Sequence, residues 1–232
     1  MHARLTLSLV FCVSTFWLSA ASAETIAIVG TGDVAAALGP EFSAQGHTIV
    51  YGSRKPQSKK SEDLVAKTGV NASVVSPAES IVDADIVVLA VPGMLVAEIV
   101  QGLGDLSGKI IIDPTNPMER KLTTFHHAVE TSNAEIIQQI APKADVVKAF
   151  NTLNWKTMID PQSAGGAVSI PLAGDSRGAK KVVAELAEGM GLEPIDVGGV
   201  ENARWVEGML ILWINNRFST RDSFDFYLRK TH

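Results

Sequence analysis

The stretch Thr25-Ile-Ala-Ile-Val-Gly-Thr-Gly-Asp-Val-Ala35 decides the fold of this chain. A short β-branched run leads into the pattern G-x-G-x-x-A, and the residues that follow keep helical spacing. Gly30 permits a tight turn, Gly32 lets backbone amides approach a pyrophosphate, and the small Ala35 lets the helix pack closely on the strand. The strand, loop and helix together predict a dinucleotide-binding unit that holds phosphates at a helix N-terminus.

The end of the second predicted strand indicates which dinucleotide is bound. A unit that binds NAD places an acidic residue about 20 residues after the loop, against the ribose 2′-hydroxyl. This chain has Gly52-Ser-Arg-Lys55 there. Ser53 can donate a hydrogen bond to a 2′-phosphate and Arg54 can bind it with a charged fork, while Lys59 and Lys60 add positive potential. The alternative is a solvated basic turn, but the missing acid favours NADP(H).

The composition excludes several classes of protein. The chain has 232 residues, 46% of them hydrophobic, and a formal net charge of -5, which is the balance of an ordinary globular protein. No basic block offers a footprint for a phosphate backbone, so we expect no nucleic-acid partner. Cys12 is the single cysteine, and we find no cluster of His, Asp or Glu with ligand spacing, so we expect no disulfide and no metal.

The first residues are typical of a targeting segment. Residues 1–23 contain a short positive start, an apolar stretch and the sequence Ala21-Ser-Ala23. This pattern predicts a Sec signal peptide, and hence a periplasmic or secreted protein. The alternatives are an uncleaved membrane anchor, although the apolar run is shorter than the roughly 20 residues that span a bilayer, and a later start codon. Export conflicts with the use of NADP(H), because the cell keeps its NADP(H) in the cytoplasm.

The remainder of the chain alternates between short apolar runs and helical stretches. This alternation is typical of a parallel sheet with crossover helices. The predicted strands are 25–29, 48–51, 72–75, 86–90, 110–113, 145–149, 168–173 and 194–197. The predicted helices are 34–45, 57–67, 94–103, 132–140, 177–190 and 203–217. We therefore expect one domain over residues 24–232, a Rossmann-type, doubly wound α/β fold with a mainly parallel sheet and a small C-terminal α/β and helical extension.

The C-terminal tail carries more apolar surface than a terminal helix needs. Residues 202–229 contain aromatic and aliphatic side chains that include Trp205, Leu212, Trp213 and Phe218. A helix of this kind packs across the sheet or against a second copy of the chain. We therefore expect a homodimer.

A series of motifs along the chain resembles one family. The motifs are Gly30-Thr-Gly-Asp33, Gly52-Ser-Arg54, Leu89-Ala-Val-Pro92, Thr115-Asn-Pro117, Lys148-Ala-Phe-Asn-Thr152, Ala173-Gly-Asp175, Asp196-Val-Gly198 and Asn202-Ala-Arg204. In this order they resemble the NADPH-dependent reductases of the 8-hydroxy-5-deazaflavin coenzyme F420, and also the NADPH domain of STEAP-type metalloreductases. The resemblance runs from Thr25 to about Trp213.

The resemblance implies a set of cofactor-binding residues, each of which follows the carboxyl end of a predicted strand, where open α/β sheets bind ligands. One group would contact the phosphates, a second the 2′-phosphate, a third the ribose and nicotinamide side, and a fourth would lie near the nicotinamide. In that order they are Gly30, Thr31, Gly32, Asp33 and Val34; Ser53, Arg54 and Lys59; Val91 and Pro92; and Asn116, Ala149 and Asn151.

The resemblance also implies the chemistry. A hydride passes between NADP(H) and a deazaflavin (F420) or flavin-type acceptor, a small molecule, and the cofactors carry the reaction, so we predict no catalytic side chain. His126 or His127 could donate a proton, but a solvated or structural role is the simpler interpretation of both. Lys148 could approach the substrate, as lysines do in hydroxyacid dehydrogenases, but those enzymes carry a long helical domain after the Rossmann unit that we do not predict here. Two alternatives stay open: a ferric or cupric reductase that works through flavin, and a non-catalytic NADP(H)-binding module.

Overall fold

Strand β1 (Thr25–Val29) lies within a parallel sheet in the computed structural model, which describes residues 23–219 and 225–231. Its residues Ile26, Ala27 and Ile28 are fully buried, because helices cover both faces of the sheet. The six strands follow the order β3-β2-β1-β4-β5-β8. Their bounds are β2 (Thr48–Gly52), β3 (Ala72–Val75), β4 (Ile86–Leu89), β5 (Ile110–Asp113) and β8 (Asp145–Lys148).

The strand order reverses direction beside β1. Strands β2 and β3 extend from one side of β1, whereas β4, β5 and β8 extend from the other. The loops that leave β1 and β4 therefore diverge and open a crevice at the carboxyl edge of the sheet. This order confirms the predicted Rossmann-type, doubly wound fold.

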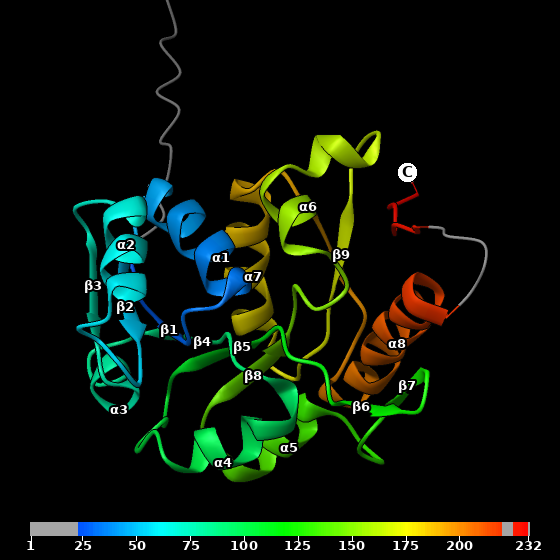
Figure 1. Cartoon of the computed structure of the whole chain (residues 1–232), viewed down its shortest axis with the longest axis horizontal. Coiled ribbons are helices and arrows are strands. Elements are labelled where there is room, and N and C mark those ends of the chain that lie inside the picture. The colour runs from blue at the N-terminus through cyan, green and yellow to red at the C-terminus, as the bar shows by residue number, and fades with distance from the viewer. Residues whose placement is uncertain (1–22, 220–224, 232) are drawn as a thin grey trace, which may run out of the picture.

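Helices cover the two faces of the sheet (Figure 1). One face packs against α1 (Asp33–Ala44), α2 (Lys59–Thr68), α6 (Trp155–Ile159) and α7 (Arg177–Gly189). The other face packs against α4 (Val96–Gln101) and α5 (Asn133–Ile140), with the short α3 (Pro77–Ser80) and η1 (Gly93–Leu95) nearby. The predicted helix 94–103 is thus divided into a 3-10 turn and a shorter α-helix.

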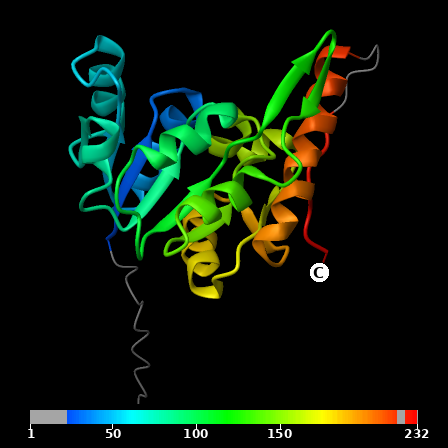
Figure 2. The ribbon, with the colours of Figure 1, turned by 90° about the horizontal axis from the view of Figure 1, so that it is seen from below.

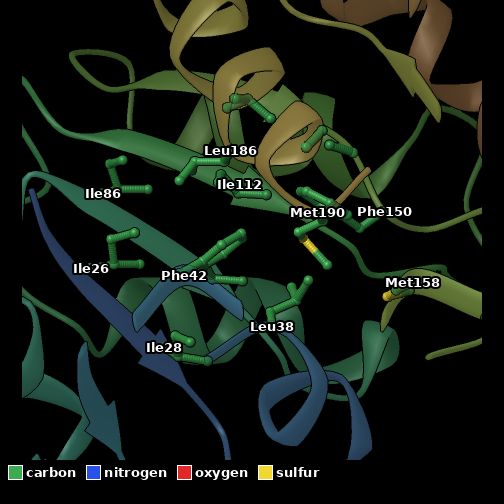
Figure 3. Packing of buried hydrophobic residues seen from close by; sticks show 14 of the residues in the cluster. Ile26, Ile28, Leu38, Phe42, Ile86, Ile112, Phe150, Met158, Leu186 and Met190 are labelled. Carbon is green, nitrogen blue, oxygen red and sulfur yellow. The ribbon is translucent and has the colours of Figure 1, made fainter. Parts of the chain in front are cut away.

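The core beneath α1 joins segments that are far apart in the sequence (Figure 3). Phe42 of α1 lies against Phe150, which follows β8. The ring centroids are 6.1 Å apart and the ring planes meet at 65°. Aromatic rings favour this edge-to-face arrangement. Figure 3 also shows apolar side chains from β1, α6, α7 and the residue that follows α7 near this pair: Ile26, Ile28, Met158, Leu186 and Met190.

The C-terminal part adds a second, smaller sheet and a long helix. Strands β9 (Ser169–Leu172) and β10 (Glu193–Asp196) pair in parallel with each other, and a bridge between Lys148 and Ala173 connects them to β8. Two 3-10 turns, η2 (Pro161–Ala164) and η3 (Val200–Asn202), precede β9 and α8 (Ala203–Ser219). This arrangement agrees with the predicted C-terminal α/β and helical extension.

The sequence did not predict the short helices α3 and α6, the 3-10 turns η2 and η3, or a hairpin. Strands β6 (Met118–Lys121) and β7 (Thr124–His127) form an antiparallel hairpin, which lies along α8 (Figure 2). The predicted signal peptide, residues 1–23, lies outside the described residues apart from Ala23. Within the described ranges, the search for a helix long and apolar enough to cross a bilayer finds none.

Candidate functional site

A cleft of about 870 Å³ opens at the carboxyl edge of the sheet, where the strand order reverses. The loops that follow β1, β2 and β4 form its walls. Seven of the predicted site residues line this one cleft: Gly30, Thr31, Gly32, Ser53, Arg54, Val91 and Pro92. The sheet topology therefore brings together residues from three separate motifs.

The two glycines of the first loop meet different surroundings. Gly30 has φ of +115°, and a Cβ there would lie 2.1 Å from the carbonyl oxygen of Ala90. A Cβ on Gly32 would meet nothing within 4 Å, so the backbone at this position faces open space in the cleft. Gly32 is also the N-cap of α1, and no side chain caps that helix. The first N–H groups of α1 are thus available to an anion.

The end of β2 supplies positive charge to the same cleft. Ser53 is buried, and its hydroxyl lies 3.1 Å from that of Ser61 and accepts a hydrogen bond from the backbone N–H of Lys55. Arg54 and Lys55 are exposed side chains in the cleft wall, and Lys60 lies in the same wall. An anion held here would meet a serine hydroxyl and three cations.

Lys59, which was predicted as a cofactor ligand, lies elsewhere. Its Nζ pairs with Asp63 Oδ1 at 2.9 Å on the exposed face of α2, and it is absent from the cleft lining. The neighbouring Lys60 takes the place in the cleft. This difference follows from helical geometry, because consecutive residues of α2 point about 100° apart. Asp33 and Val34 are in the first turn of α1, where Asp33 is exposed and Val34 half-buried.

The three predicted nicotinamide-side residues gather beyond the ends of β5 and β8. Asn151 Nδ2 donates to Asn116 Oδ1 at 2.9 Å and to the carbonyl oxygen of Val206 at 3.2 Å, while Ala149 is fully buried. Asn116 abuts Gly93, where a Cβ would lie 2.0 Å from the Asn116 carbonyl oxygen. These residues do not line the cleft itself, but Gly93 follows Pro92, which does.

Two features of this region are unusual. Phe150 has φ of +62°, a left-handed conformation that side chains other than glycine rarely adopt. Asn151 Oδ1 is buried and has no hydrogen-bond partner among the described residues. Strained backbone and unpaired polar atoms cost free energy and concentrate at functional sites.

Lys148 lies in a buried ionic cluster that the sequence did not predict. Its side chain is 0% exposed, and Nζ lies 2.6 Å from both Asp113 Oδ2 and Glu207 Oε1. Glu207 also contacts His127. No periodic signal in the sequence pairs these residues, since they come from β5, β7, β8 and α8. The Lys148 ammonium group therefore pairs with two buried carboxylates, Asp113 and Glu207, and does not point toward a substrate in the cleft.

Within residues 23–219 and 225–231, no group of three His, Cys, Asp or Glu side chains is arranged to hold a metal ion. His126 contacts Thr124 Oγ1 at 2.9 Å on the hairpin surface. The cleft lining contains hydroxyls and basic side chains.

Comparisons with known proteins agree with this geometry. The family model described as NADP oxidoreductase, coenzyme F420-dependent, matches residues 25–117. A crystal structure of a candidate F420-dependent NADP reductase from Arthrobacter sp. FB24 is 30% identical, with a TM-score of 0.75 over 82% of this chain and 91% of that one. The F420-dependent NADP reductase of Methanothermobacter thermautotrophicus is 26% identical over 84% of this chain and 90% of its own length.

A third relative extends well beyond this chain. The metalloreductase STEAP3 of Rattus norvegicus is 31% identical over 188 residues, which are 81% of this chain but 36% of the metalloreductase. The chain thus spans about a third of that relative's length. The similarity to the Arthrobacter structure, by contrast, covers nearly the whole of both proteins. The chain therefore belongs to the family of F420-dependent NADP reductases and is an NADP-dependent oxidoreductase.

Proposed function

We propose that this oxidoreductase transfers a hydride between NADP(H) bound in the cleft and a deazaflavin coenzyme of the F420 type or a flavin. The observation that carries the proposal is the meeting of two features in one cleft. An uncapped helix N-terminus behind Gly32 faces the cleft, and Arg54, Lys55 and Lys60 line its wall. Glu98 is the carboxylate among the lining residues of the described chain, so cations predominate there.

The first loop fits a pyrophosphate. Gly32 leaves room for close approach, and Thr31 stands beside it in the cleft wall. The N–H groups of Asp33 and Val34, at the start of α1, would then donate to phosphate oxygens. Gly30 makes this geometry possible because its positive φ brings the chain past the Ala90 carbonyl without a clash.

The end of β2 fits a 2′-phosphate. Ser53 would present its hydroxyl, and Arg54 would form paired charge-assisted hydrogen bonds with the phosphate oxygens. Lys55 and Lys60 would add positive potential from the same wall. A ribose 2′-hydroxyl offers none of these cations a partner, which supports the choice of NADP(H) over NAD(H).

The nicotinamide side would lie along Val91, Pro92 and the turns that hold Asn116 and Asn151. Val91 and Pro92 are apolar walls of the cleft, and they would keep water from the nicotinamide ring. The Asn116–Asn151 pair, linked at 2.9 Å, would hold the two turns in register beside that ring. Asn151 Oδ1, which has no partner among the described residues, is an acceptor suited to an amide N–H.

When bound, NADPH supplies a hydride, and the acceptor takes up this hydride together with one proton from solvent. The protein's contribution is then to hold the dinucleotide at its phosphates and to exclude water at its reactive end. Neither task requires a side chain that itself reacts. This is consistent with a cleft whose described lining contains no histidine or cysteine.

A second candidate function is the reduction of ferric or cupric ions through a flavin. The identity of 31% with the metalloreductase STEAP3 favours it as an alternative. The same cleft would bind NADPH, and a bound flavin would pass electrons to the metal. The two candidates differ in the acceptor and not in the cofactor.

An anaerobic acceptor assay tests the proposal. The protein is mixed with NADPH and F420, and the deazaflavin absorbance is followed, with NADH in place of NADPH as the control. Rapid loss of absorbance with NADPH and little with NADH supports the proposal. If F420 stays oxidised while FAD is reduced, the acceptor is the flavin. Reduction of a ferric chelate faster than free reduced FAD achieves alone supports the second candidate function.

A further inference from the structure

Lys148 connects two carboxylates to the turn that carries Asn116. Its Nζ lies 2.6 Å from Asp113 Oδ2, from Glu207 Oε1 and from the carbonyl oxygen of Thr115. The contact with the Thr115 carbonyl oxygen is a hydrogen bond that Nζ donates, whereas the contacts with the two carboxylates are ion pairs, and Asp113 Oδ2 has no hydrogen-bond partner among the described residues. The side chains of Lys148, Asp113 and Glu207 are all 0% exposed.

The cluster is continuous with the edge of the cleft. Asp113 Oδ1 accepts hydrogen bonds from the backbone N–H of Thr115 at 2.8 Å and from its hydroxyl at 2.6 Å. Asn133 Nδ2 donates to Thr115 Oγ1 at 2.7 Å and to the carbonyl oxygen of Gly93 at 3.0 Å. The backbone N–H of Asn133 donates to Glu207 Oε1 at 2.9 Å. The cluster therefore holds both the turn before Asn116 and the chain that follows Pro92.

His127 connects this buried cluster to the surface, and its hydrogen bonds require a particular proton. The Nδ1 atom lies 2.7 Å from the carbonyl oxygen of Val129, which can only accept, so Nδ1 carries a proton. The Nε2 atom lies 2.8 Å from Glu207 Oε2. Two lone pairs would repel at this distance, so one further proton lies between His127 and Glu207. The His127 side chain is 23% exposed and can exchange that proton with solvent.

The shared proton balances the charge of the cluster. With it, the His127–Glu207 pair is neutral and the charges of Lys148 and Asp113 cancel. Without it, a net negative charge remains in a buried site, which is costly. Burial raises the pKa of Glu207; the charge of Lys148 opposes this and that of Asp113 adds to it.

The other charged groups nearby already have partners. Arg204, one turn before Glu207 on α8, pairs with Glu135 of α5. On the hairpin, Glu119 pairs with Lys121 at 3.2 Å, and His126 contacts Thr124. The Arg120 guanidinium lies over the ring of Phe125. None of these contacts supplies the missing proton to Glu207.

We propose that Lys148, Asp113, Glu207 and His127 form a positioning cluster for the nicotinamide side of the cleft, completed by one proton shared between His127 and Glu207. The inference deepens the proposed function and rests on it. When the pH rises and the proton leaves, His127 and Glu207 separate, and Glu207 competes with Thr115 and Asp113 for Lys148. The turn that carries Asn116 then loses its support.

The test compares two neighbouring histidines and two ligands. Dissociation constants of NADPH and of 2′-phospho-ADP-ribose, which lacks nicotinamide, are measured from about pH 5 to about pH 9 by calorimetry. Their ratio cancels the titration of the 2′-phosphate. In the wild type and in the matched control His126→Gln, the dissociation constant of NADPH divided by that of 2′-phospho-ADP-ribose should rise about three- to tenfold as the pH rises. In His127→Gln it should stay flat, at the value the wild type shows at high pH.

Several results would overturn the inference. A ratio that does not change with pH in the wild type, or that changes equally in His127→Gln, means that the cluster does not position the nicotinamide side. Failure of the wild type to bind either ligand would instead reject the proposed function. Because His127 is partly exposed, its replacement leaves the buried members of the cluster in place.

A second readout needs no ligand. The ring nitrogens of His127 are followed by NMR in the wild type, in Glu207→Gln and in His126→Gln. At one fixed pH, the chemical shift of the His127 Nε2 atom should change in Glu207→Gln, which removes its partner, and stay unchanged in His126→Gln. An unchanged Nε2 shift in Glu207→Gln would show that no proton is shared.

Discussion

At the residue scale, the two cleft glycines allow stability and binding to be separated. Gly32→Ala places a methyl group in open space in the cleft, so we expect a free energy of unfolding within about 0.5 kcal/mol of the wild type and NADPH affinity about tenfold lower. Gly30→Ala is the contrasting variant, since its methyl group would meet the Ala90 carbonyl oxygen at 2.1 Å and the residue has a positive φ. It should lose both stability and binding. Thermal unfolding and NADPH titration of both variants check this, and normal NADPH affinity in Gly32→Ala would argue against the pyrophosphate site.

Arg54 is expected to select the dinucleotide. Removing hydrogen bonds between charged partners costs about 1.5–3 kcal/mol, so Arg54→Ala should weaken NADPH binding by about 10- to 100-fold and leave NADH binding nearly unchanged. Lys59→Ala is the matched control, because Lys59 is a nearby cation that pairs with Asp63 and does not line the cleft. Fluorescence titration with both dinucleotides measures the effect. Equal losses for NADPH and NADH would remove Arg54 from the 2′-phosphate site.

The residue scale also shows where sequence reasoning ended. The motif around Gly30 predicts its own geometry, because a tight turn and a helix N-terminus are local features. The roles of Lys59 and Lys60 depend on which face of α2 each occupies, and the spacing of two adjacent lysines does not decide this. Lys148 of β8 pairs with Asp113 of β5 and Glu207 of α8, so its place in an ionic cluster follows from tertiary structure alone.

At the element scale, Tyr51 joins β2 to α2 and gives the fold an alkaline limit. Its hydroxyl lies 2.7 Å from Thr68 Oγ1, and Thr68 donates its own proton to the Leu64 carbonyl oxygen, so Tyr51 is the donor. Burial raises the pKa of Tyr51 to about 12 from 10.0. Because the folded state holds this proton more tightly than the unfolded state, the full stabilisation is present below pH 10. It is lost as the pH rises from 10 to 12, where the unfolded state releases the proton first.

This sign predicts the behaviour of Tyr51→Phe. Between about pH 9 and about pH 11, the unfolding free energy of the wild type should fall by about 1 kcal/mol more than that of the variant. Above about pH 12 the difference should approach about 3 kcal/mol. Urea unfolding of both proteins at the two pH values measures the difference. An identical decline in both proteins would show that Tyr51 does not titrate with unfolding.

The elements that were predicted correctly share a local cause. The strands of the six-stranded sheet are short apolar runs because both faces are covered, and such runs are visible in the sequence. The β6–β7 hairpin has no such signal. Its turn contains Leu122 at φ of +56°, where glycine would be expected. Strand β7 is held by Asn215 of α8, whose side-chain amide makes two hydrogen bonds with the backbone of Phe125. A contact across 90 residues cannot be read from local pattern.

At the scale of the whole molecule, α8 is the exposed apolar element that supports the expected homodimer. Trp205 is 72% exposed, Leu212 60% and Phe218 69%. We predict that Leu212→Glu shifts a dimer toward monomer in light scattering at micromolar concentrations, because it places a charge in an apolar contact. The control is Val70→Glu, which lies on a fully exposed turn between α2 and β3, at the opposite end of the molecule from α8 (Figure 2). A wild type with a monomeric mass would reject the dimer.

The family and the fold converge on one activity for the whole molecule. Membership in a family of reductases supports an oxidoreductase over the binding module without catalysis that the sequence left open. Choice of acceptor depends on the shape of the site in which it binds. Spacing in a sequence does not describe such a shape, so the acceptor is the part of the function that needs experiment.

The most direct test of hydride transfer follows the transferred atom. NADPH carrying deuterium at the transferring position of the nicotinamide ring is mixed anaerobically with the protein and F420, and the products are analysed by mass spectrometry. We predict that deuterium appears at the ring carbon of the reduced deazaflavin, because a hydride moves directly between two carbons held at close range. Reduced deazaflavin without deuterium, or oxidised deazaflavin beside bound NADPH, would contradict direct transfer in this cleft.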